Sequence, residues 1–275
     1  RKSSRKRKSP SKGTPSREIK LLESFKDAVL YLGAVSLVFI PLEKAFSVQE
    51  RPVFRAEFFT DLVFYLGQIL VWNELTVSVL RFLFAQERWK FISPFQERVS
   101  LLPFWAVLFL TVFFSDLFIY WGHRLQHRIS FLWKFHRVHH TALSLDYIAA
   151  YREHPLDNIY TRGLETLPAV ILGLDLNSIS GFIVFRGLFG LFIHSNTNLR
   201  FGFLEKLIGS PHLHHWHHEI EKGGNCNFAN LSPLMDILFG TYYSPEENAE
   251  NFGIRENIGR GYFEQILESF RFSSK

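Results

Sequence analysis

All twelve histidines of the 275-residue chain lie between residues 123 and 218, so they mark one region. His123 and His127 are four residues apart, which places both imidazoles on one face of a helix. The spacing His-x2-His-His follows at residues 136–140 and recurs at residues 214–218. Imidazole binds iron, zinc, copper and nickel. The spacing therefore predicts shared helical faces that bind two transition metals, with eight ligands: His123, His127, His136, His139, His140, His214, His217 and His218.

The alternative is a set of solvated histidines or a His-rich tract. Such tracts rarely repeat one spacing, whereas this chain repeats it in segments whose first histidines, His136 and His214, are 78 residues apart. Cys226 is the only cysteine, which excludes an internal disulfide and a four-thiolate metal site. Imidazole nitrogen is thus the predicted ligand atom.

Several apolar segments surround the histidines. Residues 25–46 and 58–84 are each long enough for a membrane span, although polar residues interrupt the second. Residues 101–121 form the cleanest span and run without a break into the first histidines. Residues 164–193 contain proline, glycine and aspartate, which indicates a kinked pair or a helical hairpin. Buried helices of a large soluble core are the alternative, but three runs of about 20 residues favour spans. The predicted fold is an all-α, polytopic membrane helical bundle with a cytosolic, histidine-rich metal-binding cap.

The net charge of +5 is concentrated in the first 20 residues. This segment cannot bury apolar surface, and it predicts a disordered basic arm over residues 1–20. Such an arm could bind nucleic acid, but nothing downstream indicates a nucleic-acid-binding fold. A cytoplasmic arm beside an anionic membrane surface is the favoured interpretation, with no nucleic-acid partner.

The number of imidazoles indicates the chemistry. Zinc hydrolases need three protein ligands and an open position. Eight imidazoles exceed that need and match two metals. A pair of irons at the end of membrane helices suggests O2 activation on a lipid, because the apolar substrate can reach the metals from the bilayer.

With its neighbouring residues, the histidine pattern resembles the fatty acid hydroxylase/sterol desaturase superfamily of membrane di-iron oxygenases. The spacing between the histidine segments is similar to that of the branch containing alkylglycerol monooxygenases. The resemblance covers about residues 105–243, and its parts are the first box with an upstream aspartate (116–127), the second box (133–141), an Arg-Glu-His-Pro element (152–155), the third box (210–218) and a closing segment (227–241).

The resemblance implies the organisation and some further site residues. N-terminal membrane helices would occupy residues 21–100, a fatty acid hydroxylase-like catalytic domain residues 101–245, and a C-terminal tail residues 246–275. The cofactor would be two Fe, with zinc as a possible substitute. His194 begins a segment where some relatives have His-x3-His, so it would be a ninth ligand and Asn198 a weak or supporting one. His154, in the Arg-Glu-His-Pro element, is a candidate supporting residue near the metals on the same resemblance.

Two aspartates are candidates for orienting the ligands. Asp116 lies seven residues before His123, almost two helical turns, and so on the same face. A ligating imidazole usually donates its other N–H to a carboxylate or a carbonyl, which gives Asp116 and Asp236 that role. The alternative for Asp116 is an interfacial residue paired with an arginine. No catalytic side chain beyond the metal ligands is predicted.

The predicted protein is a membrane non-haem di-iron oxidoreductase that uses O2 and external electrons to hydroxylate or desaturate a lipid (sterol, fatty acyl or ether lipid). The sequence leaves the choice between these two reactions open. A di-zinc membrane hydrolase and a catalytically inactive lipid-binding relative are the alternatives. No Gly-x-Gly-x-x-Gly turn and no iron–sulfur cysteine spacing occurs, so a ferredoxin or a small haem carrier with its reductase would supply electrons. This electron donor would dock on the basic residues Arg124, Arg128, Lys134 and Arg137. The alternative is that these charges only anchor helices at lipid headgroups.

The expected location is the bacterial inner membrane or the endoplasmic reticulum, with the active site facing the cytoplasm. A basic arm favours a cytoplasmic N-terminus, and three full spans would then carry His123 to the opposite side. We therefore expect residues 58–84 to cross only in part; an N-terminus outside is the alternative.

Overall fold

The computed structural model describes residues 17–175, 178–222, 224–256 and 258–271. Within these ranges the chain forms helices and loops, with two isolated β-bridges, Ser47–Thr197 and Glu219–Phe252, and no strand. The all-α prediction is therefore confirmed. Most of the predicted basic arm, residues 1–16, lies outside the described residues, and residues 17–20 already belong to the first helix.

Three long apolar helices are each sufficient in length and composition to cross a membrane. They are α1 (Arg17–Ala45), the continuous helix made of α2 (Phe58–Gly67), the π-helical turn η1 (Gln68–Trp72) and α3 (Asn73–Leu83), and α5 (Phe104–Arg128). Large apolar side chains on them are exposed, among them Leu37 and Phe109, which lipid can cover. The protein is an integral membrane protein. Residues 58–83 form one continuous helix that is long enough to cross a membrane completely. Partial crossing of residues 58–84 therefore stays a prediction.

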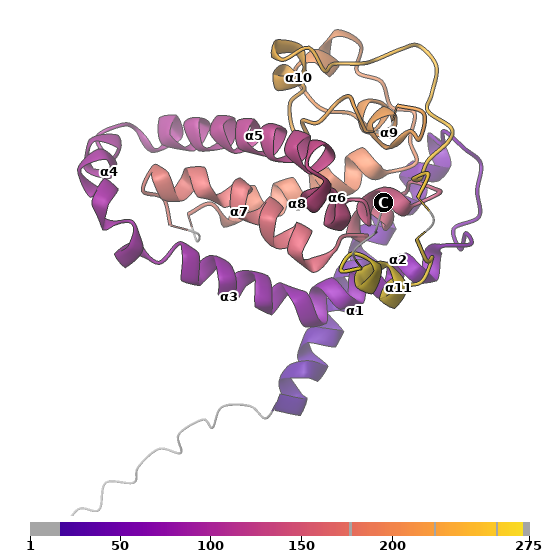
Figure 1. The fold of residues 1–275 in the computed structure, drawn as a ribbon, viewed down its shortest axis with the longest axis horizontal. Coiled ribbons are helices and arrows are strands. Elements are labelled where there is room, and N and C mark those ends of the chain that lie inside the picture. The colour runs from indigo at the N-terminus through magenta and orange to yellow at the C-terminus, as the bar shows by residue number, and fades with distance from the viewer. Residues whose placement is uncertain (1–16, 176–177, 223, 257, 272–275) are drawn as a thin grey trace, which may run out of the picture.

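Shorter helices complete the bundle. The turns η2 (Gln86–Arg88) and η3 (Lys90–Ile92) lead into α4 (Ser93–Val99), and α7 (Pro155–Ile171) and α8 (Ser180–His194) form the predicted pair of helices. The helix α7 packs against both α5 and α3, while α1 runs obliquely to them (Figure 1). A Cβ atom on Gly122 would lie 2.0 Å from Leu164 Cδ1, so this glycine permits the close approach of α5 to α7.

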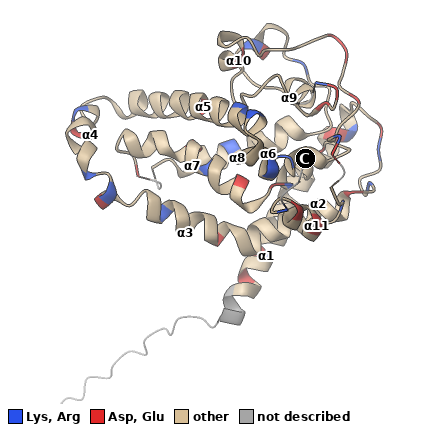
Figure 2. Ribbon diagram, viewed as in Figure 1, with Lys and Arg blue, Asp and Glu red and all other residues tan. Residues whose placement is uncertain are grey.

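The remaining elements form a cap at the end of the bundle where α5 terminates (Figure 1). They are α6 (Ser130–His136), η4 (His139–Thr141), η5 (Ala149–Tyr151), η6 (Gly202–Lys206), α9 (Pro211–His218), α10 (Leu234–Leu238) and α11 (Tyr262–Glu268). Figure 2 shows that charged residues gather around this cap and at α4, and that only a few lie on the helices between. This distribution is expected when lipid surrounds the middle of the bundle.

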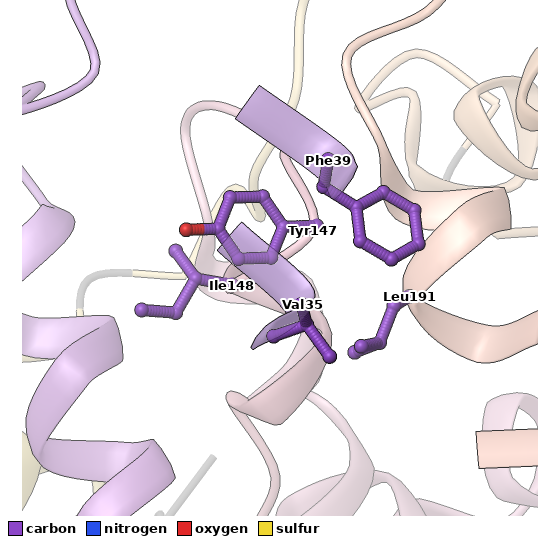
Figure 3. Packing of buried hydrophobic residues seen from close by; sticks show 5 residues of the cluster. All are labelled: Val35, Phe39, Tyr147, Ile148 and Leu191. Atoms are coloured by element: carbon purple, nitrogen blue, oxygen red, sulfur yellow. The ribbon is translucent and has the colours of Figure 1, made fainter. Parts of the chain in front are cut away.

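An apolar cluster joins α1 to the cap (Figure 3). The ring of Tyr147 stacks on Phe39 with 5.5 Å between centroids, and its hydroxyl lies 2.8 Å from Ser36 Oγ. Val35, Ile148 and Leu191 complete the buried cluster. Because Leu191 belongs to α8, the cluster also fixes the helix that carries His194.

A buried ion network joins α2 to the segment before α7. Asp61 accepts from Arg55 Nη2 and from Arg152 Nε, both at 2.6 Å. Arg55 also pairs with Asp146 at 2.7 Å. Arg152 is fully buried, and its Nη1 lies 3.4 Å from Glu57 Oε1. Paired in this way, the charges can be buried, and they fix the path of the chain between the second histidine segment and α7.

The C-terminal segment folds back onto the bundle. Trp72 Nε1 donates to Tyr262 Oη at 2.7 Å, and Thr141 Oγ1 donates to Gln265 Oε1 at 3.0 Å. Phe270 packs against Phe135. The predicted tail thus contributes a docked helix, α11, that covers the second histidine segment.

Candidate metal centre and substrate cavity

The structure brings the nine predicted ligands together in two groups. Within each group, one nitrogen of every ring lies within 4.8 Å of the others. Group one contains His123, His127, His136, His140 and His217, and group two contains His139, His194, His214 and His218. All but His127, which is half-buried, are buried. Two adjacent sets of nitrogen ligands result.

Histidines four residues apart enter the same group in all three segments, as expected from a shared helical face. The expectation is wrong for His139 and His217, which enter the other group. The helix α6 ends at His136, and His139 and His140 lie on the 3₁₀ turn η4 and enter different groups. On α9, His217 and His218 also enter different groups. Consecutive residues on a helix point about 100° apart, so one segment can supply ligands to two metals. Each of these segments therefore bridges the two groups.

Local sequence explains where α9 begins. Pro211 occupies the first helical turn, and the Ser210 side chain accepts a hydrogen bond from Leu213 N. The helix packs against α8, whose last residue is His194. This contact brings the third histidine segment to the second group.

Backbone carbonyls orient the rings of group one. His123 Nδ1 donates to Phe228 O at 2.7 Å, and His217 Nδ1 donates to Cys226 O at 2.8 Å. Because a carbonyl can only accept, each bond places the proton on Nδ1 and leaves the Nε2 lone pair free for a metal.

Group two is oriented in the same manner. His139 Nδ1 donates to Arg152 O at 3.1 Å, and His194 Nδ1 donates to Gly190 O at 2.7 Å. The guanidinium of Arg152 belongs to the ion network, so the network helps to fix the carbonyl that orients His139. The ligand tautomers in both groups thus depend mainly on the path of the backbone.

Asp157 was not predicted from the sequence. Its Oδ2 accepts from His136 Nδ1 at 3.0 Å, and its Oδ1 accepts from Gln126 Nε2. It lies in the first turn of α7, just after His154 and Pro155. The proline marks a helix start, where acidic residues are common for electrostatic reasons alone, so the sequence signal was ambiguous.

The Nε2 atoms face one another at spacings that suit a shared cation. The distance is 3.0 Å for His123–His136, His139–His194 and His194–His214. Ligands about 2.1 Å from a metal are about 3.0 Å apart at right angles and about 3.4 Å apart in a tetrahedron. These pairs therefore match ligands bound to one ion.

The protonation of these rings also fits metal binding. Burial, with the neighbouring imidazoles, lowers the pKa of His214, His217 and His218 well below the usual histidine value, so these rings are neutral at physiological pH. The Nε2 atoms of His127 and His217 are buried and form no hydrogen bond with any described residue. Unpaired buried nitrogens of neutral rings are the donor set that a transition metal requires.

The cap fits closely over the first group. Gly224 has φ +65°, and a Cβ atom there would lie 2.3 Å from His127 Cε1. Only glycine suits both the backbone and this contact.

The two predicted aspartates act on the backbone and touch no ligand ring. Asp236 accepts from Phe228 N at 2.8 Å and Ala229 N at 2.9 Å, and so fixes the carbonyl that orients His123. Asp116 accepts from the N–H groups of residues 231 and 232 and lies 3.6 Å from Arg186.

Two other predicted residues lie apart from both groups. His154 accepts a hydrogen bond from Leu156 N at the start of α7, and its ring packs against Phe135 and Phe270. Asn198 is exposed, and its backbone N donates to Phe46 O. Their predicted roles at the metal remain hypotheses, and the observed contacts are structural.

The buried carboxyl of Asp236 gives a prediction. Burial raises its pKa to about 6, so between the unfolded pKa and pH 6 the folded protein binds a proton that the unfolded chain releases. This contribution to stability is present at low pH and is lost as the pH rises through 6. Relative to Asp236→Asn, the wild-type free energy of unfolding should fall by up to about 3 kcal/mol from about pH 4 to pH 7. Chemical denaturation of both proteins in mild detergent measures this; a constant difference would contradict it.

A cavity of 620 Å³ adjoins both histidine groups. Side chains of α3, α5, α7 and α8 line it, many of them apolar, such as Leu80, Ile119 and Ile183. Five histidines also form part of its wall: His123, His136, His139, His194 and His214. A lipid chain in this cavity would therefore lie against both groups.

Comparison with known proteins agrees with this arrangement. The fatty acid hydroxylase family profile matches residues 108–241. An ornithine lipid hydroxylase of Rhizobium tropici is 27% identical over 249 residues, covering 88% of this chain and 75% of that protein. Human alkylglycerol monooxygenase is 28% identical over 171 residues (60% of this chain, 36% of that protein), and a Delta(7)-sterol 5(6)-desaturase of Aspergillus fumigatus is 29% identical over 164 residues (52% and 50%). No solved structure matches significantly. The chain belongs to the fatty acid hydroxylase/sterol desaturase superfamily.

Proposed function

We propose that this protein is a membrane-bound, O2-dependent oxygenase that hydroxylates a lipid, with two irons bound by the two histidine groups. One observation carries the proposal: histidines of both groups line a largely apolar cavity that can accept a lipid. Hydroxylation is favoured over desaturation because the relative that matches 88% of this chain is named a hydroxylase, whereas the sterol desaturase matches 52%.

Each part of the site has a definite task. The apolar wall binds the lipid chain and excludes water. Asp157 and the backbone carbonyls hold protons on the Nδ1 atoms, which keeps the Nε2 atoms available as ligands. When bound, two irons would supply the redox chemistry needed to activate O2. Zinc can occupy the same imidazoles, so it is a substitute to control for.

The electrons would come from a ferredoxin, or from a small haem carrier with its reductase. Of the basic residues proposed as its docking surface, Arg128 is exposed at the end of α5. Arg124 donates to Tyr120 Oη and Arg137 donates to Glu268 O. We therefore place the docking surface around Arg128, on the cytoplasmic face of the bacterial inner membrane or the endoplasmic reticulum.

Metal analysis and reconstitution test the function together. We expect about two irons per chain, because there are two groups of four or five ligands. The purified protein is then reconstituted with a lipid extract, and labelled O2, NAD(P)H and the donor chain are added singly and together. Labelled oxygen should enter a lipid only with the complete set.

Several outcomes would overturn the proposal. One metal ion or none would contradict the di-iron centre. Lipid cleavage without a reductant would show a hydrolase, and saturable lipid binding without product under all conditions would show an inactive binder. Reconstitution without the electron donor is the matched control.

A further inference from the structure

Five arginine and glutamate side chains line the cavity, and three of them lie together, apart from Arg81 and Glu153. Arg162 and Glu165 extend from α7, and Arg186 extends from α8. Asp116 of α5 stands 3.6 Å from Arg186. These four residues are called the charge cluster. Burying ionisable groups is costly, which makes such a cluster a candidate binding site.

The charge cluster is separated from the histidines by two helical turns. Glu165 lies eight residues after Asp157, which contacts His136, on α7, and Arg186 precedes His194 by eight residues on α8. Eight residues of helix correspond to about 12 Å. One cavity therefore contains metal ligands at one level and charged groups at another.

The hydrogen bonding within the cluster is incomplete. Arg162 Nη1 donates to Glu165 Oε2 at 2.6 Å. Glu165 Oε1 is buried and accepts no hydrogen bond from any described residue, and Arg186 Nε lies 3.5 Å from it. Arg186 Nη1 is likewise 3.5 Å from Ser115 Oγ. Glu165, which is 2% exposed, thus retains an acceptor for a ligand, and Arg186, which is 8% exposed, retains donors.

The charge balance restricts that ligand. Two guanidinium groups and two carboxylates make the cluster neutral overall. Adding a net charge to this buried cluster would cost desolvation energy that no counter-charge in the cluster offsets. The ligand group should therefore carry no net charge, while it accepts from Arg186 and donates to Glu165.

We propose that the charge cluster binds the polar group of the substrate, a group without net charge that both donates and accepts hydrogen bonds. An amide, a polyol and a zwitterion share this chemistry. The substrate is then a polar lipid with such a group about two helical turns from the oxidised carbon. This inference rests on the proposed function and names the substrate class for the same cavity.

Binding of three probes with one acyl chain tests the proposal. Oleamide donates and accepts, methyl oleate only accepts, and oleate is an anion. The purified protein, with its iron content measured, is titrated with each probe in a nonionic detergent by calorimetry. Oleamide should bind at least about tenfold more tightly than the other two, because only it satisfies both residues without adding charge. Equal binding of all three would overturn the proposal.

Two variants assign the preference to the cluster. Glu165→Gln leaves it positive, so oleate should bind about tenfold more tightly than it does to wild type. Arg186→Gln leaves it negative, and oleamide should lose about tenfold in affinity without a gain for oleate. Glu97→Gln, an equal change of charge on the exposed surface of α4, is the matched control and should change nothing.

The outcomes separate this proposal from the proposed function. If Glu165→Gln behaves like the Glu97→Gln control, the charge cluster is not the binding site. Binding is measured without O2 or reductant, so a protein that prefers oleamide but contains no iron contradicts only the oxygenase. A protein with two irons and no preference contradicts only the present proposal.

Discussion

Turnover is expected to fall by more than about 100-fold in each of the variants His217→Ala and His214→Ala. Residues that only support a ligand already cost tenfold to 100-fold when replaced, and these substitutions remove a ligand from group one and group two respectively. Each variant should also lose the metal ion of its own group. Metal content per chain and turnover with the complete donor chain are the two measurements.

His215→Gln is the control for both variants. His215 lies on the same short helix, and its Nε2 is 3.0 Å from Ser195 O, outside both groups. It should retain two metals. If His217→Ala or His214→Ala kept the wild-type metal content and turnover within tenfold, the assignment of ligands would be wrong.

Arg152→Met is expected to have the largest effect on stability. Arg152 is fully buried and donates to Asp61, which is also buried. Without Arg152, the buried network has the two carboxylates of Asp61 and Asp146 against the one guanidinium of Arg55. Removal of one partner from a buried ion pair costs about 3–5 kcal/mol, because it leaves charge that is not compensated. In thermal unfolding in mild detergent, this corresponds to a decrease in the midpoint of about 10 °C.

A second substitution tests the cause. Without Arg152, the guanidinium of Arg55 pairs with two carboxylates, those of Asp61 and Asp146. Adding Asp61→Asn removes the excess negative charge, so the double variant should be more stable than Arg152→Met. Arg98→Met, on the exposed surface of α4, is the control and should change the free energy of unfolding by less than about 0.5 kcal/mol. A loss for Arg152→Met as small as that of the control would show that the pair adds no stability.

The sequence predicted the parts of this protein that depend on local pattern. Apolar length is a local property, so the long helices and the α7–α8 pair were predicted correctly. The histidine spacing identified eight of the nine side chains that come together, and the family resemblance added the ninth, His194. It could not assign His139 and His140 to different groups, because that division depends on the end of α6 and on the 3₁₀ turn after it.

The supporting contacts could not be predicted because they are made over long sequence distances. The acceptor for His123 is a carbonyl 105 residues away. Which carbonyl accepts this hydrogen bond depends on the path of the backbone, and the residue type at position 228 does not indicate it. Asp157 acquires its role only when α7 packs against α6, and Gln265 only when α11 folds back. Pairwise spacing contains no information about such approaches.

The π-helical turn η1 changes what the two halves of one long helix can reach. Before it, Asp61 and Tyr65 are buried towards the ion network and α1; after it, Thr76 and Leu80 are buried on the side of α7. Each residue added to a helix rotates the later residues by about 100°. A one-residue deletion in this turn would move the second half out of phase with the cavity, whereas a substitution would leave the phase intact. We therefore expect relatives to keep the number of residues in this segment more strictly than the residue types in it.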